Sequence, residues 1–175
     1  MLSSFDFSNY SRITVDNCSF ARIAKNYIGE IFTFQSQIIV FLDNILVTGI
    51  LNSENFFNGI CLNFSLTNSV FKNLNGTAYA LLVVQTDSFN LLGNYFETIY
   101  FSTPSIPYFY IIGSAGLISS NYFKGFNGNL ASILTILLSS AVLTNNTFTF
   151  INTSSFMILL NWSTNVSVSN CTFIV

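Results

Sequence analysis

The sequence predicts an all-β solenoid, a fold in which the chain winds through stacked coils of similar length. Three observations support this prediction. A motif of eight residues recurs along the chain, apolar and polar residues alternate within it, and strong helix formers such as Glu, Lys, Ala and Gln are scarce. The motif is clearest in residues 64–71, 141–148 and 166–173.

Each copy of the motif ends on a bulky apolar residue, which we call the anchor. The anchors expected from the sequence are Phe20, Leu46, Phe71, Phe96, Phe123, Phe148 and Phe173, separated by 26, 25, 25, 27, 25 and 25 residues. Self-similarity at a fixed period of about 20–50 residues indicates a repeat architecture. The seven anchors therefore predict about seven coils.

The residues seven and five positions before each anchor are expected to point inward, because all of them are apolar or small. They are Ile13 and Val15, Ile39 and Phe41, Phe64 and Leu66, Phe89 and Leu91, Gly116 and Ile118, Ala141 and Leu143, and Val166 and Val168. Polar residues occupy nine of the fourteen positions six and four before the anchors. Alternation with a period of two indicates a strand that has one buried face.

An asparagine lies three or two residues before every anchor, where the chain is expected to turn. The set is Asn17, Asn44, Asn68, Asn94, Asn121, Asn145 and Asn170. Asparagine tolerates the left-handed backbone region, and its amide bonds to neighbouring backbone groups. We expect these residues to stack as a structural ladder along one corner, most with their side chains inside. Replacing Asn145 with Ala is then expected to remove a buried hydrogen bond.

A second extended stretch follows about ten residues after each anchor and is apolar on both faces. Examples are residues 31–34, 80–84, 108–112, 133–138 and 156–160. Strands covered on both sides have this pattern. Alternation would turn Leu134, Leu137 or Leu159 outward, beside Val83 or Tyr110 of neighbouring coils. We therefore expect a partner chain, another part of the same protein, or self-association on this apolar second face.

The order of strand, asparagine turn, short strand, loop and apolar strand resembles the right-handed parallel β-helix of the pectin-lyase-like superfamily. The resemblance rests on the coil repeat itself and covers nearly the whole chain. It implies a single β-helix domain over residues 1–175, which starts and ends within a coil. That superfamily includes polysaccharide lyases and hydrolases, phage tailspikes, adhesins and protist surface proteins. The resemblance therefore predicts the fold and leaves the function open.

Charged side chains are few, which limits the chemistry. The chain has five Lys and Arg, seven Asp and Glu, no His, and a net charge of −2. No basic patch for nucleic acid is formed by this pattern. Asp16 and Asp43 fall in adjacent coils and would lie about 5 Å apart. The functional interpretation of this pair is catalysis or calcium binding, and the structural interpretation is that Asp43 replaces a ladder asparagine and Asp16 is an exposed strand residue. We predict no catalytic, metal-binding or cofactor-binding residue.

The residue after the anchor is Lys72, Glu97 and Lys124 in three successive coils. Stacking would bring these side chains into an alternating ion ladder, because equivalent positions in neighbouring coils are about 4.8 Å apart. We expect its role to be structural, with Glu97 as a general acid as the alternative. Two neighbouring cations should lower, rather than raise, the pKa of Glu97.

The cysteines and the glycosylation sequons give further expectations. Cys18, Cys61 and Cys171 are an odd number, and Cys18 and Cys171 lie six coils apart, too far for a disulfide within the chain. We expect small buried or turn thiols. Nine Asn-X-Ser/Thr sequons occur, of which Asn75 and Asn152 fall in expected loops and are the candidate glycosylation sites.

These observations favour a non-enzymatic segment of an extracellular or cell-surface β-helix protein, such as a stalk, coat or adhesin. The alternative is a carbohydrate-active lyase or hydrolase, or a glycan-binding module, of the same fold. We expect no nucleic-acid partner and no cofactor; glycans are candidate partners. No signal peptide is visible, and the longest apolar run, about residues 131–143, is too short for a membrane-spanning helix.

Overall fold

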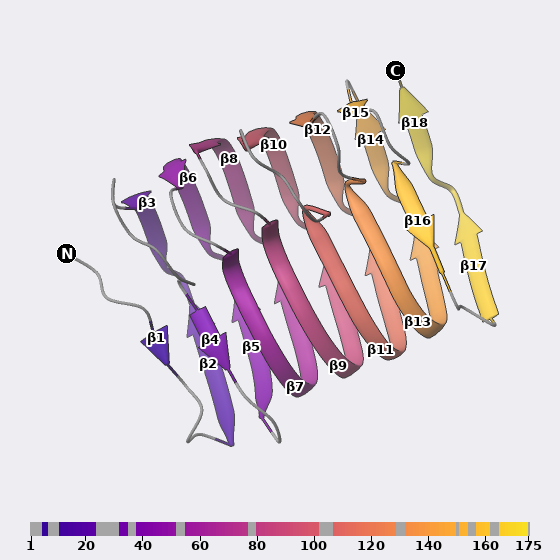
Figure 1. The fold of residues 1–175 in the computed structure, drawn as a ribbon, viewed down its shortest axis with the longest axis horizontal. Coiled ribbons are helices and arrows are strands. Elements are labelled where there is room, and N and C mark those ends of the chain that lie inside the picture. The colour runs from indigo at the N-terminus through magenta and orange to yellow at the C-terminus, as the bar shows by residue number, and fades with distance from the viewer. Residues whose placement is uncertain are drawn as a thin grey trace.

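The structure is a computed structural model that describes residues 5–6, 11–23, 32–34, 38–51, 55–76, 80–101, 107–128, 132–149, 151–153, 157–161 and 165–174. Every regular element within these ranges is a β-strand. The strands line three sides of a flattened coil, which we call side one, side two and side three (Figure 1).

The strands of each side are stacked in chain order. Side one contains β1 (Phe5–Asp6), β4 (Phe32–Phe34), the first halves of β7 (Asn55–Thr67), β9 (Ala80–Leu92), β11 (Phe109–Ser119) and β13 (Leu134–Thr144), and β16 (Ile158–Leu160). Side two contains β2 (Arg12–Asp16), β5 (Ile39–Asp43), the second halves of the same four long strands, and β17 (Asn165–Ser169). Side three contains β3 (Ser19–Ile23), β6 (Leu46–Leu51), β8 (Val70–Gly76), β10 (Tyr95–Phe101), β12 (Tyr122–Gly128), β14 (Thr147–Thr149), β15 (Asn152–Thr153) and β18 (Thr172–Ile174).

All strand pairings are parallel, and each strand pairs with its equivalent in the next coil. In Figure 1 the chain runs down the near side and up the far side while it advances from left to right, which is a right-handed coil. The predicted fold class, an all-β parallel β-helix, is confirmed. Within the described residues about five turns are formed, fewer than the seven coils expected. The first and last repeats contribute only short strands such as β1, β4, β16 and β18.

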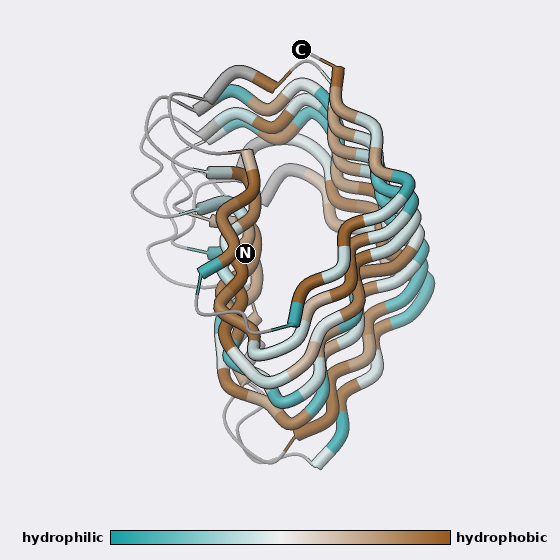
Figure 2. Tube along the Cα trace, turned by 90° about the vertical axis from the view of Figure 1, so that its right-hand side faces the viewer, coloured by the Kyte–Doolittle hydropathy of each residue, from teal (hydrophilic) through white to brown (hydrophobic). Residues whose placement is uncertain are grey.

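Stacked phenyl rings form the centre of the core behind side three. The ring centroids of Phe71, Phe96, Phe123, Phe148 and Phe173 follow one another at 5.2, 5.1, 4.7 and 5.1 Å. In the last two contacts the rings are within 4° of parallel. In-register pairing places identical side chains above one another, and Figure 2 shows the resulting alignment of residues of similar hydropathy from coil to coil. Burial of these rings supplies much of the hydrophobic stabilisation.

The expected anchor of the second coil, Leu46, is wrong by one residue. Phe20 pairs in register with Val47, which in turn pairs with Phe71, and Val47 is fully buried while Leu46 is not. The inward residues of this coil shift with it. Val40 and Leu42 are buried, whereas Ile39, expected inside, is 39% exposed.

The physical reason for this shift is that residues 38–42 are all apolar, so alternation does not fix which face turns inward. Asn44 fixes the register instead. Its φ of 49° lies in the left-handed region, and this turn stands three residues before Val47, as Asn68 (φ 47°) stands before Phe71.

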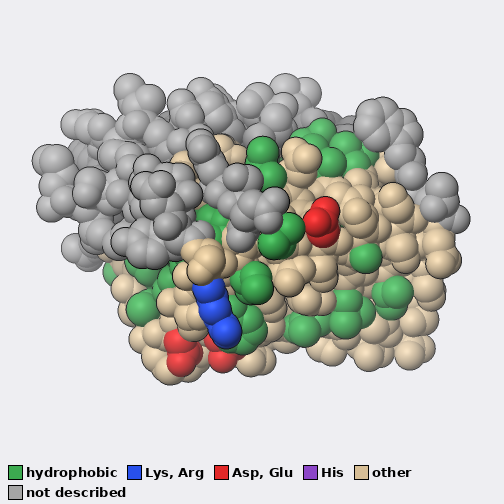
Figure 3. Space-filling model, turned by 90° about the horizontal axis from the view of Figure 1, so that it is seen from below, with side chains coloured by type: hydrophobic (Ala, Val, Ile, Leu, Met, Phe, Trp, Pro, Cys, Tyr) green, Lys and Arg blue, Asp and Glu red, His purple; other side chains and the backbone are tan. Residues whose placement is uncertain are grey.

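Side one has a buried inner face and a half-buried outer face. Leu134, expected to point outward, is fully buried, because it pairs in register with Phe109 of the inner face. Leu137 and Leu159 are half-buried, as are Val83 and Tyr110. Seen from below, the hydrophobic side chains on the described surface form separate groups among polar and backbone atoms (Figure 3).

Side three contains a second bend that the sequence reasoning missed. Asn73, Thr98 and Gly125, each two residues after an anchor, have φ values of 54°, 53° and 65°. Thr98 is unusual, because a β-branched residue rarely adopts this region. The bend turns the next residue back into the core, so that Leu74, Ile99 and Phe126 stack in register and are buried.

The stacked rings lead to a first prediction. Phe123→Ala, in the middle of the column, should lower the free energy of unfolding by about 3–5 kcal/mol, because it leaves a cavity between two rings. Phe173→Ala in the same column should cost clearly less in dilute solution, since Phe173 is 49% exposed. Urea unfolding followed by circular dichroism measures both, and equal losses would contradict the stacking arrangement.

Candidate functional site

The predicted asparagine ladder is divided between two neighbouring columns at the corner that joins side two to side three. The first column lies three residues before the anchors and contains Asn17, Asn44, Asn68, Asn145 and Asn170, all with positive φ and all exposed. Gly93 and Ser120 complete it, with φ values of 64° and 58°. Its backbone N–H groups donate to the next coil, as from Asn145 to the Ser169 carbonyl at 3.1 Å. This column forms the turn.

The second column lies two residues before the anchors, and it is buried between its half-buried end members Cys18 and Cys171. Its amides are those of Asn94, Asn121 and Asn146, which are 1%, 2% and 0% exposed. The Nδ2 group of Asn94 donates to Oδ1 of Asn121 at 3.0 Å, and Nδ2 of Asn121 donates to Oδ1 of Asn146 at 3.0 Å. We call this set the amide column.

The amide column also satisfies backbone groups of three coils. Oδ1 of Asn121 accepts the backbone N–H of Asn94, and Nδ2 of Asn121 donates to the carbonyl of Leu91 at 2.7 Å. Ser69 begins the chain of bonds, because its backbone N–H donates to Oδ1 of Asn94 while its hydroxyl accepts the N–H of Ile45. These buried groups would be costly without partners.

Two corrections to the expected ladder follow. Most of its members have exposed side chains, so the expectation of buried amides fails for Asn17, Asn44, Asn68, Asn145 and Asn170. The buried residue of the sixth copy of the motif is Asn146 and not Asn145. Sequence reasoning missed Asn146 because two asparagines stand side by side there, and either fits the spacing.

The structure places the three residues of the expected ion ladder in register, and among the described residues one ion pair is formed, between Glu97 and Lys124. Glu97 pairs in register with Lys72 on one side and with Lys124 on the other. Lys124 Nζ lies 2.7 Å from Glu97 Oε1. This hydrogen bond is the main cause that holds the pKa of Glu97 below its usual value and raises the pKa of Lys124. Lys72 lowers the pKa of Glu97 further, as the weakest of the contributions.

Two tyrosines beside this ion pair were not singled out from the sequence. The rings of Tyr95 and Tyr122 stack with centroids 5.0 Å apart and within 3° of parallel. Partial desolvation, followed by the charge of Glu97, raises the pKa of Tyr95. Because the two rings cover each other's faces, they stabilise the coil stack and do not present an open platform on their shared sides.

The acidic pair Asp16 and Asp43 lies in register on neighbouring strands of side two, as the sequence indicated. Oδ1 of Asp43 accepts hydrogen bonds from the hydroxyl of Thr67 and from Nδ2 of Asn68, the latter at 3.0 Å. Beside them, Nδ2 of Asn44 donates to Oδ1 of Asn17. Asp43 thus acts as an acceptor within the turn. No group of three or more His, Cys, Asp or Glu side chains that would hold a metal occurs among the described residues.

The three cysteines have free thiols in two different environments. Cys61 is buried in side one, and burial raises the pKa of its thiol to about 11. Cys18 and Cys171 are half-buried in the same column as the buried amides. Cys171 Sγ accepts a bond from Nδ2 of Asn146 at 3.8 Å and donates to the Leu143 carbonyl at 3.7 Å.

The candidate glycosylation sites lie in strands and not in loops. Asn75 belongs to β8, where it pairs with Ile50 and Tyr100, and its side chain is exposed. Asn152 belongs to β15 and pairs with Asn127. The expectation of a loop at Asn75 rested on the Asn75–Gly76 pair, which is a common turn signal. In the structure β8 continues through both residues, so no loop begins there.

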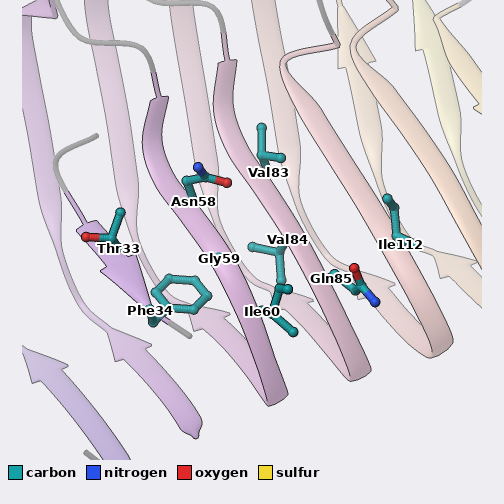
Figure 4. Close-up of a pocket in the computed structure, with 9 residues that line it drawn as sticks. All are labelled: Thr33, Phe34, Asn58, Gly59, Ile60, Val83, Val84, Gln85 and Ile112. Atoms are coloured by element: carbon teal, nitrogen blue, oxygen red, sulfur yellow. The ribbon is translucent and has the colours of Figure 1, made fainter. Parts of the chain in front are cut away.

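A pocket of about 450 Å³ opens on side one, between β4, β7, β9 and β11 (Figure 4). Its polar lining comes from Thr33, Asn58 and Gln85, and its apolar lining includes Ile60, Val83, Val84 and Ile112. Gly59 gives the floor its shape: a Cβ there would lie 2.1 Å from the Phe34 carbonyl oxygen, so only glycine fits. The amide and hydroxyl groups give this pocket the means to bind a neutral polar ligand. Sequence reasoning missed the pocket, because no motif marks it.

The comparisons with known proteins were made against family models, curated proteins and solved structures, and none of them found a match. Topology and register define the chain as a parallel β-solenoid protein. Within the described residues, no helix is long and apolar enough to cross a membrane.

The two asparagine columns lead to a prediction about neighbouring residues. Asn146→Ala should lower the free energy of unfolding by about 1–3 kcal/mol, because buried backbone and amide partners lose their bonds. Asn145→Gly should change it by less than about 0.5 kcal/mol, because glycine adopts the positive φ freely and the lost side chain is exposed. Thermal unfolding of the two variants checks this, and the reverse order would refute the assignment.

The ion pair leads to a prediction about charge and pH. The lowered pKa of Glu97 means that its stabilisation is fully present above the pKa of the unfolded chain and is lost as the pH falls through the folded pKa. At neutral pH and low salt, Glu97→Lys should destabilise more than Glu97→Gln, since it places three cations in neighbouring coils. Melting temperatures measured from acid to neutral pH test this. Equal stability of the two variants would contradict the ladder.

Proposed function

We propose that this chain is a non-enzymatic structural segment of an extracellular or cell-surface β-solenoid protein, acting as a stalk, coat or adhesin. The observation that carries the proposal is the continuity of its columns. The phenyl rings, the buried amides and the turn residues each repeat from coil to coil. The polar groups of the corner and of side three are used largely to hold one coil to the next.

The state of the acidic side chains also supports a structural role. Glu97 has a lowered pKa and is paired with Lys124, so it is a carboxylate at neutral pH and a poor proton donor. Asp43 is engaged by Thr67 and Asn68. Membership of the pectin-lyase-like superfamily is part of this proposal. It is supported by the right-handed parallel coil and by the stacked asparagines.

The test of this function is the location of the protein in its own cells. Antibodies raised against the purified chain should stain intact, unpermeabilised cells or bind protein released into the medium. Enzymatic removal of N-linked glycans should shift its electrophoretic mobility if Asn75 is modified, and Asn75→Gln should remove that shift. Staining that requires permeabilisation would contradict the surface location, whatever the result at Asn75.

The second candidate is a carbohydrate-active or glycan-binding module, and the pocket on side one favours it. The amides of Asn58 and Gln85 beside the apolar Ile60 and Val83 suit the polar edge and the apolar face of a sugar ring. Binding of a panel of glycans to immobilised protein would test it. Gln85→Ala should then weaken binding, and Asn90→Ala, on the same strand but outside the pocket lining, should not.

The structural proposal predicts that the chain does not cleave polysaccharides. Pectin-like and host-type glycans incubated with the purified chain should release no unsaturated or reducing sugar ends. Asp16→Asn and Asp43→Asn are the matched controls, because they replace the in-register acidic pair while keeping its shape. Release of such ends by the unmodified chain, and its loss in either variant, would make the chain an enzyme and refute the structural function.

A further inference from the structure

Three Asn-X-Ser/Thr sequons with described side chains lie in coils that have a neighbouring coil on both sides. Their asparagines are Asn63, Asn75 and Asn145, and all three are exposed. Among the described residues, no hydrogen bond engages any of these three side chains. The buried asparagines of the same coils belong to no sequon, and they are Asn55, Asn94, Asn121 and Asn146. The sequons are thus confined to amides that are open to modification.

The register of the coil keeps sequons out of the amide column. Two residues after each member of that column stands an anchor, and its phenyl ring fills the core, so no hydroxyl residue can occupy this position. In β7, by contrast, Asn63 and Ser65 point to the same outer face, because successive side chains of a strand alternate. The sequon hydroxyl therefore accompanies an asparagine that faces outward. A sugar attached there displaces no side chain of the core.

Two of these asparagines stand beside exposed apolar side chains of neighbouring coils. Asn63 of β7 pairs in register with Ile39 of β5, and Asn75 of β8 pairs in register with Tyr100 of β10. Ile39 and Tyr100 are 39% and 43% exposed, which places them among the most exposed large apolar residues of the described chain. Paired positions lie about 4.8 Å apart. A ring attached to either amide would therefore reach over the apolar neighbour.

The chemistry of a sugar ring suits these neighbours. A pyranose has an apolar C–H face and polar hydroxyl edges, so it can remove an aliphatic or aromatic side chain from water while its hydroxyls stay hydrated. The composition gives such a cover a purpose, because only 7% of the residues are charged, against about a quarter in a typical soluble domain. Glycans add hydration without charge, and so without repulsion between neighbouring coils.

We propose that Asn63 and Asn75 carry N-linked glycans, and that the first sugar of each packs over its in-register neighbour, Ile39 or Tyr100. Asn145 is a third site of the same modification. It lies in the column of turn residues, where the adjacent coil contributes the small polar Ser120, so its glycan has no large apolar side chain to cover. The two kinds of site make different predictions: all three should be occupied, but only the first two glycans should stabilise the coil.

The modification is a transfer from an oligosaccharide carried on a lipid diphosphate. Nδ2 of the asparagine forms a bond to the anomeric carbon of the first sugar, and the C–O bond from that carbon to the diphosphate breaks. The lipid diphosphate leaves with the electron pair, and the amide nitrogen loses one proton. The inference rests on the proposed extracellular location, because this donor acts in the secretory pathway.

The first test is site occupancy in the full chain, secreted from cultured mammalian cells behind an added secretion signal. Peptide mass spectrometry of the folded, secreted protein should find glycans on Asn63, Asn75 and Asn145. Thr147→Ser preserves the last sequon and should keep its glycan, whereas Thr147→Val should remove it. Ser65→Thr and Ser65→Ala form the same matched pair for Asn63. Folded protein in which Asn63 or Asn75 carries no sugar would overturn the proposal.

The second test measures the contact between the sugar and its neighbour. The glycosylated chain is compared with the same chain made in bacteria, which has no sugar on Asn75. Tyr100→Ala should lower the melting temperature by about 2–4 °C more in the glycosylated chain than in the bacterial one. Tyr100→Phe should show no such difference, because the ring face is kept. Tyr110→Ala, at a half-buried tyrosine of side one, should lower both melting temperatures equally.

Trimming every glycan to its first sugar should preserve the difference at Tyr100, because that ring alone lies over the side chain. Ile39→Ala applies the same comparison to the glycan of Asn63. An equal effect of Tyr100→Ala in the two chains would show that the sugar does not pack there, and would overturn the proposal. Because the experiment supplies its own secretion signal, bare sites would refute the glycans, whereas staining of the natural cells decides the surface location separately.

Discussion

Parallel pairing in a single register is the constraint on which the rest of this structure depends. Each coil repeats the hydrogen-bonding positions of the one before it, so every side chain has its equivalent about 4.8 Å above and below. A residue is therefore selected by how well it packs against its own equivalent. Phenyl rings stack, asparagine amides hydrogen-bond to one another, and short hydroxyl side chains fit side by side.

The same constraint explains the low charge of the chain. A charged side chain repeated in register would face like charges on both neighbours, which destabilises a sheet. Charged residues make up only 7% of the sequence, and the column that does contain three of them alternates in sign. The in-register carboxylates of Asp16 and Asp43 are the exception, and there the hydroxyl of Thr67 and the amide of Asn68 stabilise Asp43.

The repeat, the parallel coil and the register of Lys72, Glu97 and Lys124 were predictable, because spacing alone determines them. Choices between adjacent residues were not. Leu46 and Val47 are both apolar, and Asn145 and Asn146 are the same residue, so composition and alternation fit either alternative. In the structure, the positive φ of Asn44 and of Asn145 decides both cases. The pocket on side one could not be predicted from the sequence either. Its polar lining residues Thr33, Asn58 and Gln85 come from three different coils, and no sequence motif links them.

The buried amides all point the same way. In each, Oδ1 accepts from the coil before it, while Nδ2 donates one bond to the coil after it and a second bond to a backbone carbonyl of the coil before it, so the amide-to-amide bonds all run in one direction along the axis. Hydrogen bonds arranged in such a row polarise one another. Removing one amide should therefore weaken its neighbours as well as its own coil, and the effects of Asn94 and Asn146 substitutions should not be additive. The row makes the central coils a single cooperative unit, although each coil contacts only the next.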